Sequence, residues 1–439
     1  MKRTDPPTSF GEPHGGQDPA GRPGIVFHAD ADAFFASCHR AQDPSLHGIP
    51  MVVAGDPGAR RGVVLAASYE ARPYGVRSAM PLAQALRLCP SLRVIPPDRT
   101  LYERYSVRLH SIFSDFTPEV EAFSIDEAWL NVTGALGAFA HDPIRAADRL
   151  RERVRAELGV TVSVGVSTNR HLAKQASSLR KPDSTNVLFP EDVPALLWPL
   201  PLTDLFGCGE RTAQALSRLR IVTIGDLARC APERLASVLG LSHAALLRAR
   251  ALGHDEEPVH AGGHGPARSL SAEHTLPGDV ETREEAEPIL LALADEVARH
   301  LRAEGYQGRT VVLKYKTARF ALHTSRITLP QPTALRDDLY DVACRLFVDR
   351  KVQGPVRLLG LGCTSLMRGG VQLTLDDRAR RLRLAQAEDA LRKKYGQSAV
   401  LPARLLPPPT SPPQESRGNG PGAGRPDGRG RPNRRPHGV

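Results

Sequence analysis

The most informative segment of this chain is residues 25–35, Ile25-Val26-Phe27-His28-Ala29-Asp30-Ala31-Asp32-Ala33-Phe34-Phe35. A short apolar run, typical of a buried β-strand, leads directly into carboxylates. A second apolar pair leads into another acidic cluster, Ala122-Phe123-Ser124-Ile125-Asp126-Glu127-Ala128. Carboxylates at the end of a core strand are costly to bury unless a positive charge pairs with them. Because Mg²⁺ prefers oxygen ligands and also holds substrate phosphates, we expect two-metal phosphoryl transfer.

The two acidic clusters also have a simpler interpretation. Either of them alone is equally typical of a solvated turn or a helix cap. Asp126 and Glu127 are adjacent, so on a regular strand they would point to opposite faces, and they can serve one site only where the chain turns. The strand-like pattern resumes at 128–132, which favours a tight hairpin with both acids at its tip.

Four segments, taken together, resemble the motifs of the Y-family DNA polymerases, the translesion enzymes, and in particular their bacterial DinB-like branch. In chain order they are residues 27–37, 67–81, 124–128 and 163–182. The resemblance continues more loosely to about residue 376 and leaves both termini uncovered. It implies an α/β (α+β) multidomain fold, that of a right-hand polymerase. Its parts are a ferredoxin-like palm, small fingers, a helical helix-hairpin-helix thumb and an α+β little-finger domain.

The resemblance and the composition along the chain also predict domain boundaries. In chain order, we expect a disordered N-terminus 1–23, a palm made of 24–33 and 101–190, fingers 34–100, a thumb 191–262, a little finger 267–376, a C-terminal helix 377–405 and a disordered basic tail 406–439. Strands are expected at 61–67 and 310–317. Helices are expected at 80–88, 102–113, 144–158, 283–302 and 335–350, and from 377 to 395.

The resemblance assigns catalytic residues as well. Asp30, Asp126 and Glu127 would be the catalytic metal ligands, and the backbone carbonyl of Ala31 would complete the shell of one of two Mg²⁺ ions. Asp32 is interpreted as a hydrogen-bonded structural carboxylate.

The nucleotide site follows from the same motifs. Phe35 fits the position of a steric gate that excludes the 2′-OH of ribonucleotides, with a core phenylalanine as the alternative. Phe34 would lie beside it, either against the nucleotide or in the core. Tyr69, Arg72 and Lys181 resemble contacts to the triphosphate, where arginine offers a fork and lysine a point charge.

One position departs from this pattern. The family often carries Ser or Thr at the position of Ala66, so a hydroxyl contact to phosphate is missing here. We expect the loss to weaken nucleotide binding by roughly 1 kcal/mol.

Two regions are expected to bind DNA. Residues 206–213 read as a helix-hairpin-helix, in which Gly207 and Gly209 permit a tight turn before a helix whose N-terminus faces a phosphate. An ordinary helix–helix turn is the alternative, and a weaker second hairpin is expected at 239–241. In the strand 310–317, Lys314 and Lys316 share one face, either against the DNA backbone or simply in solvent.

A clamp-binding peptide is the last motif. Gln372, Leu373 and Leu375 resemble the peptide that enters the hydrophobic pocket of a sliding clamp. Asp376 departs from the aromatic residue or leucine that often ends it, so a surface strand end is the alternative.

Composition limits the class of protein. The net charge is +10 at pH 7, which favours a polyanionic partner. The six cysteines are scattered, and no apolar run approaches 18 residues, so neither a disulfide framework nor a membrane span is expected. The N-terminal stretch has no apolar core of signal-peptide type. We expect a monomer in a bacterial cytoplasm.

The resulting hypothesis is a template-directed, error-prone DNA polymerase without proofreading that acts on primed template DNA and dNTPs in translesion synthesis and damage tolerance. Two alternatives stay open. A non-catalytic Y-family accessory protein would bind DNA and the clamp, although the presence of all three acids argues against it. A nucleotide cyclase on a similar palm would leave the helix-hairpin-helix unexplained.

Overall fold

The computed structural model describes residues 24–55, 62–262, 267–349, 354–368 and 378–406. They form two compact units, which divide the chain between Ala267 and Arg268. Each unit contains strands, helices and a hydrophobic core of its own, so the expected α/β multidomain fold is confirmed.

The N-terminal unit is built on a five-stranded sheet with the strand order β5-β6-β1-β7-β8. Its strands are β1 (Val26–Ala31), β5 (Val120–Ala122), β6 (Glu127–Asn131), β7 (Val162–Ser167) and β8 (Thr185–Val187). β1 pairs antiparallel with both β6 and β7. The expected hairpin is present, since β5 and β6 are antiparallel, but only Asp126 lies in the turn, because Glu127 is already the first residue of β6 and pairs with Asp30. β1 extends further than expected, because Asp30 lies inside the strand and not after it.

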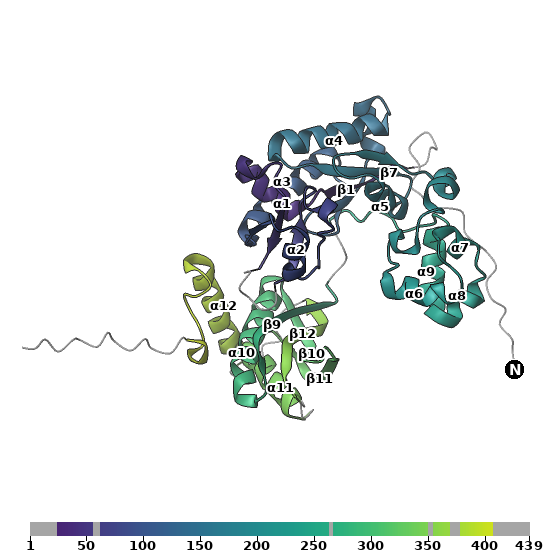
Figure 1. The fold of residues 1–439 in the computed structure, drawn as a ribbon. Coiled ribbons are helices and arrows are strands. Elements are labelled where there is room, and N and C mark those ends of the chain that lie inside the picture. The colour runs from purple at the N-terminus through teal and green to yellow at the C-terminus, as the bar shows by residue number, and fades with distance from the viewer. Residues whose placement is uncertain (1–23, 56–61, 263–266, 350–353, 369–377, 407–439) are drawn as a thin grey trace, which may run out of the picture. The chain divides into compact units, whose positions relative to one another are not determined.

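Helices cover both faces of this sheet (Figure 1). Helices α3 (Arg99–Phe116) and α4 (Pro143–Leu158) share a core with Phe27, Ala29 and Ala31, the apolar positions of β1. Both helices were expected, and α3 is longer at each end than its pattern indicated. Helix α5 (Arg170–Leu179) packs on the other face, toward which the alternation of β1 directs His28 and Asp30.

Gly165 on β7 makes this close packing of α5 possible. A Cβ atom at this position would lie 1.9 Å from the carbonyl oxygen of Ala173 and 2.3 Å from the amide nitrogen of Ser177. Only glycine therefore allows the α5 backbone to approach the sheet so closely.

A smaller sheet follows β1 in the sequence. Helix α1 (Phe34–Gln42) packs Phe34 and Cys38 into the core of the large sheet. The small sheet has the order β3-β2-β4 and a separate apolar cluster. Its elements are β2 (Met51–Ala54), β3 (Val64–Ala67), β4 (Arg93–Ile95) and helix α2 (Leu82–Leu88).

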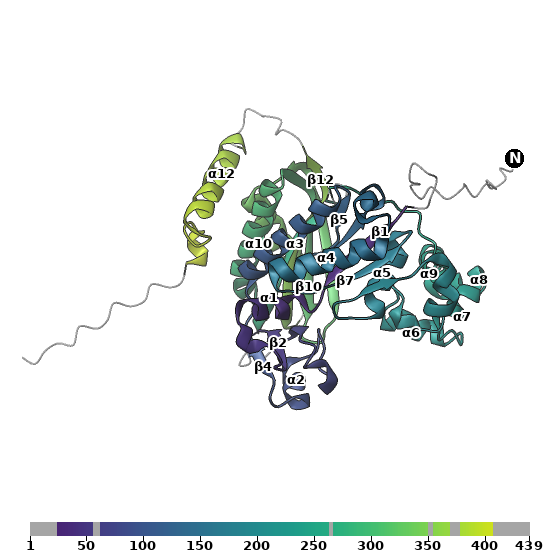
Figure 2. The same ribbon diagram turned by 90° about the horizontal axis from the view of Figure 1, so that it is seen from above.

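A bundle of short helices completes the N-terminal unit (Figure 1 and Figure 2). Its helices are α6 (Glu210–Ser217), α7 (Ile224–Arg229), α8 (Pro232–Leu239) and α9 (Leu241–Ala251). Its core includes Leu172 and Ala176 of α5, so the bundle is anchored on the helix that covers the large sheet. The turn at Gly240 between α8 and α9 matches the weaker of the two expected hairpins.

The C-terminal unit contains a four-stranded sheet with the order β11-β10-β12-β9. Its strands are β9 (Ser269–Val280), β10 (Tyr306–Thr317), β11 (Leu322–Thr333) and β12 (Val356–Arg368). Helices α10 (Arg283–Ala303) and α11 (Arg336–Asp349) cover one face, as expected. Leu313 and Tyr315 point into this core, and the two lysines of β10 lie on the other face.

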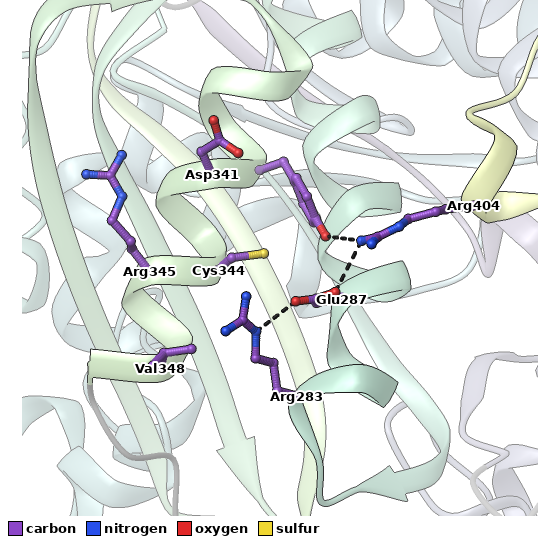
Figure 3. Close-up of a pocket in the computed structure, with 8 residues that line it drawn as sticks. Arg283, Glu287, Asp341, Cys344, Arg345, Val348 and Arg404 are labelled. Atoms are coloured by element: carbon purple, nitrogen blue, oxygen red, sulfur yellow. Dashed lines mark hydrogen bonds and ion pairs between the residues drawn. The ribbon is translucent and has the colours of Figure 1, made fainter.

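The C-terminal segment returns to the helical side of this unit. Helix α12 (Arg378–Tyr395) docks through ion pairs, in which Arg302 holds Asp389 at 2.6 and 2.8 Å and Arg392 holds Asp295 at 2.7 Å. Further along, Arg404 binds Glu287 at 3.1 Å at the edge of a cavity of about 560 Å³ between α10 and α11 (Figure 3).

Replacing Arg392 by alanine should release α12 and leave the core of the C-terminal unit folded. The Arg392 side chain is 2% exposed and also donates to the carbonyl of Val400. Breaking a buried pair costs about 3–5 kcal/mol. The core of the unit contains no residue of α12, so the lost free energy weakens the attachment of α12 and not the core itself. Hydrogen exchange of residues 378–395 measures it, and Arg383→Ala on the exposed side of α12 is the control. Unchanged protection in Arg392→Ala would contradict the expectation.

Candidate active site

Two of the predicted acids come together on the α5 face of the large sheet. Asp30 on β1 and Glu127 on β6 are direct antiparallel partners, so their side chains project side by side. Asp126 precedes Glu127 in the turn, where its carbonyl accepts a hydrogen bond from the Ala31 amide at 3.0 Å. Its carboxylate accepts a bond from Ser124 Oγ at 2.7 Å.

Two lysines neutralise the paired carboxylates. Lys181, which follows α5, forms an ion pair with Asp30. Lys174, on α5, lies 2.6 Å from Glu127 Oε2. Lys181 was expected at the triphosphate, whereas Lys174 was not predicted as a site residue. Lys174 lies in the 163–182 motif, on a helix that follows a core strand, and this position could have identified it as a site residue.

His28 is a second residue that sequence reasoning missed. It is fully buried, two positions before Asp30 and hence on the same face of β1. Its Nε2 lies 3.3 Å from Glu127 Oε2 and its Nδ1 lies 2.9 Å from Ser177 Oγ. The strand alternation could have revealed it.

Burial and pairing set the charges of this cluster. Burial lowers the pKa of His28 to about 4, so its imidazole is neutral. Burial raises the pKa of Asp30 to about 6, although Lys181 opposes this, and it also raises the pKa of Asp126. Burial would raise the pKa of Glu127 too, but hydrogen bonds with His28 and Lys174 outweigh it and lower the pKa to about 2.

The donor set fits a divalent cation. One ligand atom each from His28, Asp30 and Glu127 lies within 4.8 Å of the others. Carboxylate oxygens suit hard divalent cations, and a neutral imidazole suits transition metals. Asp126 is not part of this group, but its charge contributes to raising the pKa of Asp30.

The phenylalanines follow β1 at the start of α1. Phe35 is half-buried, and its ring centroid lies 4.4 Å from that of Tyr102 on α3. Phe34 is 4% exposed and packs in the core of the large sheet. The position of Phe34 agrees with the core alternative, while the Phe35 side chain stays partly exposed.

Asp32 joins this site to the small sheet. It accepts hydrogen bonds from Thr161 Oγ1 at 2.9 Å, Ser163 Oγ at 2.8 Å and the Asp183 amide at 2.8 Å. It is 1% exposed, which agrees with its interpretation as a structural carboxylate. Tyr69 reaches Asp32 at 3.4 Å, and the guanidinium of Arg72 stacks 3.9 Å above the Tyr69 ring.

The predicted helix-hairpin-helix has an unusual first arm. A 3-10 turn, Leu202–Asp204, stands in place of the first helix, because Pro201 and the turn at Gly207 leave too few residues for an α-helix. Gly207 has φ of +95° and lies against Arg250. Gly209 precedes α6 without a side-chain cap, so the first amides of α6 are available to an anion.

The remaining predicted residues lie in the C-terminal part of the chain. Lys314 forms an ion pair with Glu273 of β9, reaching across β12 at Gly360, where there is no side chain. Lys316 forms no ion pair with any described residue. Gln372, Leu373 and Leu375 lie outside the described residues.

Comparisons with known proteins decide the family. Residues 29–178 match the impB/mucB/samB family and residues 267–375 match its C-terminal domain. A DNA polymerase IV of Moorella thermoacetica is 42% identical over 85% of this chain and 94% of its own length. A DNA polymerase IV of Caulobacter vibrioides is 35% identical over 87% and 94%.

A solved structure of a chimeric Y-family DNA polymerase is also similar. It superimposes with a TM-score of 0.71 at 26% identity, over 79% of this chain and all of that one. The chain belongs to the Y-family of DNA polymerases. It is accordingly a DNA-directed DNA polymerase of the translesion class with a right-hand architecture, and its family uses divalent metal ions. None of the helices in the described part of the chain has the length and apolar character to cross a membrane.

Proposed function

We propose that this enzyme adds dNTPs to a primer 3′-OH with two Mg²⁺ ions held by Asp30, the Ala31 carbonyl, Asp126 and Glu127. The observation that carries the proposal is the cross-strand pair of Asp30 and Glu127, each neutralised by a lysine, with Asp126 at the adjoining hairpin tip. Bound ions would activate the 3′-OH and neutralise the pyrophosphate leaving group.

The other residues of the site would bind and orient the nucleotide. When a metal ion binds the Asp30 carboxylate, Lys181 would be released from its ion pair and contact the triphosphate. Arg72 and Tyr69 would contact the same phosphates from the side of the small sheet. Phe35 closes the space under the sugar, supported by Tyr102 and by Phe34 in the core beneath.

The DNA would be held by its backbone. Gly207 and Gly209 present the amides of α6 to a phosphate, and Lys314 and Lys316 approach the duplex from the open sheet face. Contacts of this kind carry no sequence preference, as a polymerase requires.

The domain organisation is proposed on the same grounds. The large sheet would be the palm (24–33 and 101–190), the small sheet the fingers (34–100), the bundle the thumb (191–262) and the C-terminal sheet the little finger (267–376). Gln372, Leu373 and Leu375 would bind a sliding clamp. The enzyme would act as a monomer in the bacterial cytoplasm, bypassing lesions without proofreading.

Primer extension tests the proposed function. Each dNTP is supplied singly with Mg²⁺ opposite each template base, on undamaged and damaged primed templates. We expect incorporation that follows the template base, with frequent mismatches, and no removal of a mismatched primer end. Binding of primed DNA without extension would favour the non-catalytic accessory protein instead.

A further inference from the structure

Lys174 occupies a position between the carboxylate of Glu127 and the helical bundle. Its Nζ atom lies 2.6 Å from Glu127 Oε2 and 3.2 Å from His28 Nε2. The side chain is only 13% exposed. Water screens charges weakly in such a site. A movement of this ammonium to another partner therefore changes the electrostatic potential at the Glu127 carboxylate strongly.

The same ammonium also faces three aromatic rings. Its distances to the ring centroids are 4.5 Å for Phe123, 5.1 Å for Phe206 and 5.8 Å for Trp129. Ring faces attract cations, most strongly where water is excluded. Phe206 belongs to the hairpin loop, residues 205–209, so the bundle contributes one wall of this aromatic cage.

The hairpin loop is fixed to α5 by the residue next to Lys174. Gln175, which is 4% exposed, donates to the Asp204 carbonyl at 3.0 Å and accepts from the Phe206 amide at 2.6 Å. Arg250 donates to the Phe206 carbonyl at 3.0 Å and stacks on its ring at 4.6 Å. The position of the Phe206 ring therefore follows the position of the loop.

We propose that Lys174 is a positioning residue that links the hairpin loop of the bundle to the charge on Glu127. The proposal rests on the proposed function, in which Glu127 holds a divalent cation. The ammonium has two competing sets of partners, the carboxylate and the aromatic cage. Phe206 draws it toward the cage and so leaves Glu127 open to a cation. Since coupling is reciprocal, DNA that moves the loop and a cation at Glu127 alter each other's binding.

A double-mutant cycle on the DNA-free full chain tests this link, with Mn²⁺ binding followed by electron paramagnetic resonance. Lys174→Met removes the competitor, so Mn²⁺ should bind roughly tenfold more tightly. Phe206→Leu weakens the cage and leaves Lys174 on Glu127, so Mn²⁺ should bind roughly threefold more weakly. In the Lys174→Met background, Phe206→Leu should have no effect, because it acts only through the lysine.

Controls separate this link from general damage and from the proposed function. Phe139→Leu removes a palm ring that stacks on Phe116, 5.8 Å away, and should leave Mn²⁺ binding unchanged. Lys174→Gln replaces Lys174→Met if thermal melting shows that the latter is unfolded. An effect of Phe206→Leu that persists without Lys174, or single variants with unchanged Mn²⁺ binding, would overturn the inference. Primer extension by the wild type is measured separately, so a failure of the polymerase proposal is recognised on its own.

Discussion

Replacing Asp126 and Glu127 together by alanine is expected to lower the rate of nucleotide addition by at least roughly a thousandfold. Stabilisation of transition-state charge by a metal is worth several kcal/mol, and about 1.4 kcal/mol corresponds to a factor of ten in rate. The double variant removes the two carboxylates that are proposed to bind the metal ions from β6 and its turn, and leaves the Asp126 carbonyl, which holds the Ala31 amide, in place.

Single-turnover primer extension measures this loss. Glu127→Gln keeps the size of the side chain. We propose that Glu127 holds the cation on the primer side, so this variant should lower the rate of the chemical step more than the affinity for dNTP. Asp115→Ala is the matched control, since Asp115 is an exposed carboxylate of α3 paired with Arg153. Extension by the double variant within tenfold of wild type would remove these acids from the mechanism.

The second large effect concerns the sugar. Phe35→Ala should lower the preference for dNTPs over ribonucleotides by roughly 10- to 200-fold, the range that one group of methylene size contributes in a close-fitting pocket. The ring is held against Tyr102 at 4.4 Å, so it cannot turn aside to admit a 2′-OH without losing that contact. Incorporation of dNTPs should change much less.

Steady-state incorporation of dCTP is compared with that of CTP, and each of the other three dNTPs with its ribonucleotide. The ratio of the two efficiencies gives the preference for dNTPs directly. Phe139→Ala, a partly buried palm ring outside the site, serves as the control for loss of an aromatic side chain. If Phe35→Ala rejected ribonucleotides as strongly as the wild type does, the gate would have to be sought in another side chain.

Much of this site was predictable because its determinants are local. The alternation in β1 places His28 and Asp30 on one face and Phe27 and Ala29 on the other. Two short apolar runs on either side of the acidic cluster likewise indicate the hairpin of β5 and β6 that carries Asp126 and Glu127. The side-chain period of a strand and the length of a turn depend only on neighbouring residues, so they can be read along the chain.

Other features depend on residues that are distant in sequence. Lys174 and His28 are separated by 146 positions, and they meet because Gly165 lets α5 lie directly on the sheet.

The acidic residues, the hairpin that carries two of them, the lysine-bearing strand of the C-terminal unit and the family can all be recognised in the amino-acid sequence. The pairing of each cation with its carboxylate, such as Lys174 with Glu127 and Arg392 with Asp295, becomes visible in the folded chain alone. The sequence does not reveal these pairs, because any lysine or arginine can form an ion pair with any aspartate or glutamate. The packing of buried surfaces selects the partner of each charged side chain, because it brings particular pairs within hydrogen-bonding distance. It also excludes the water that would otherwise screen their charges.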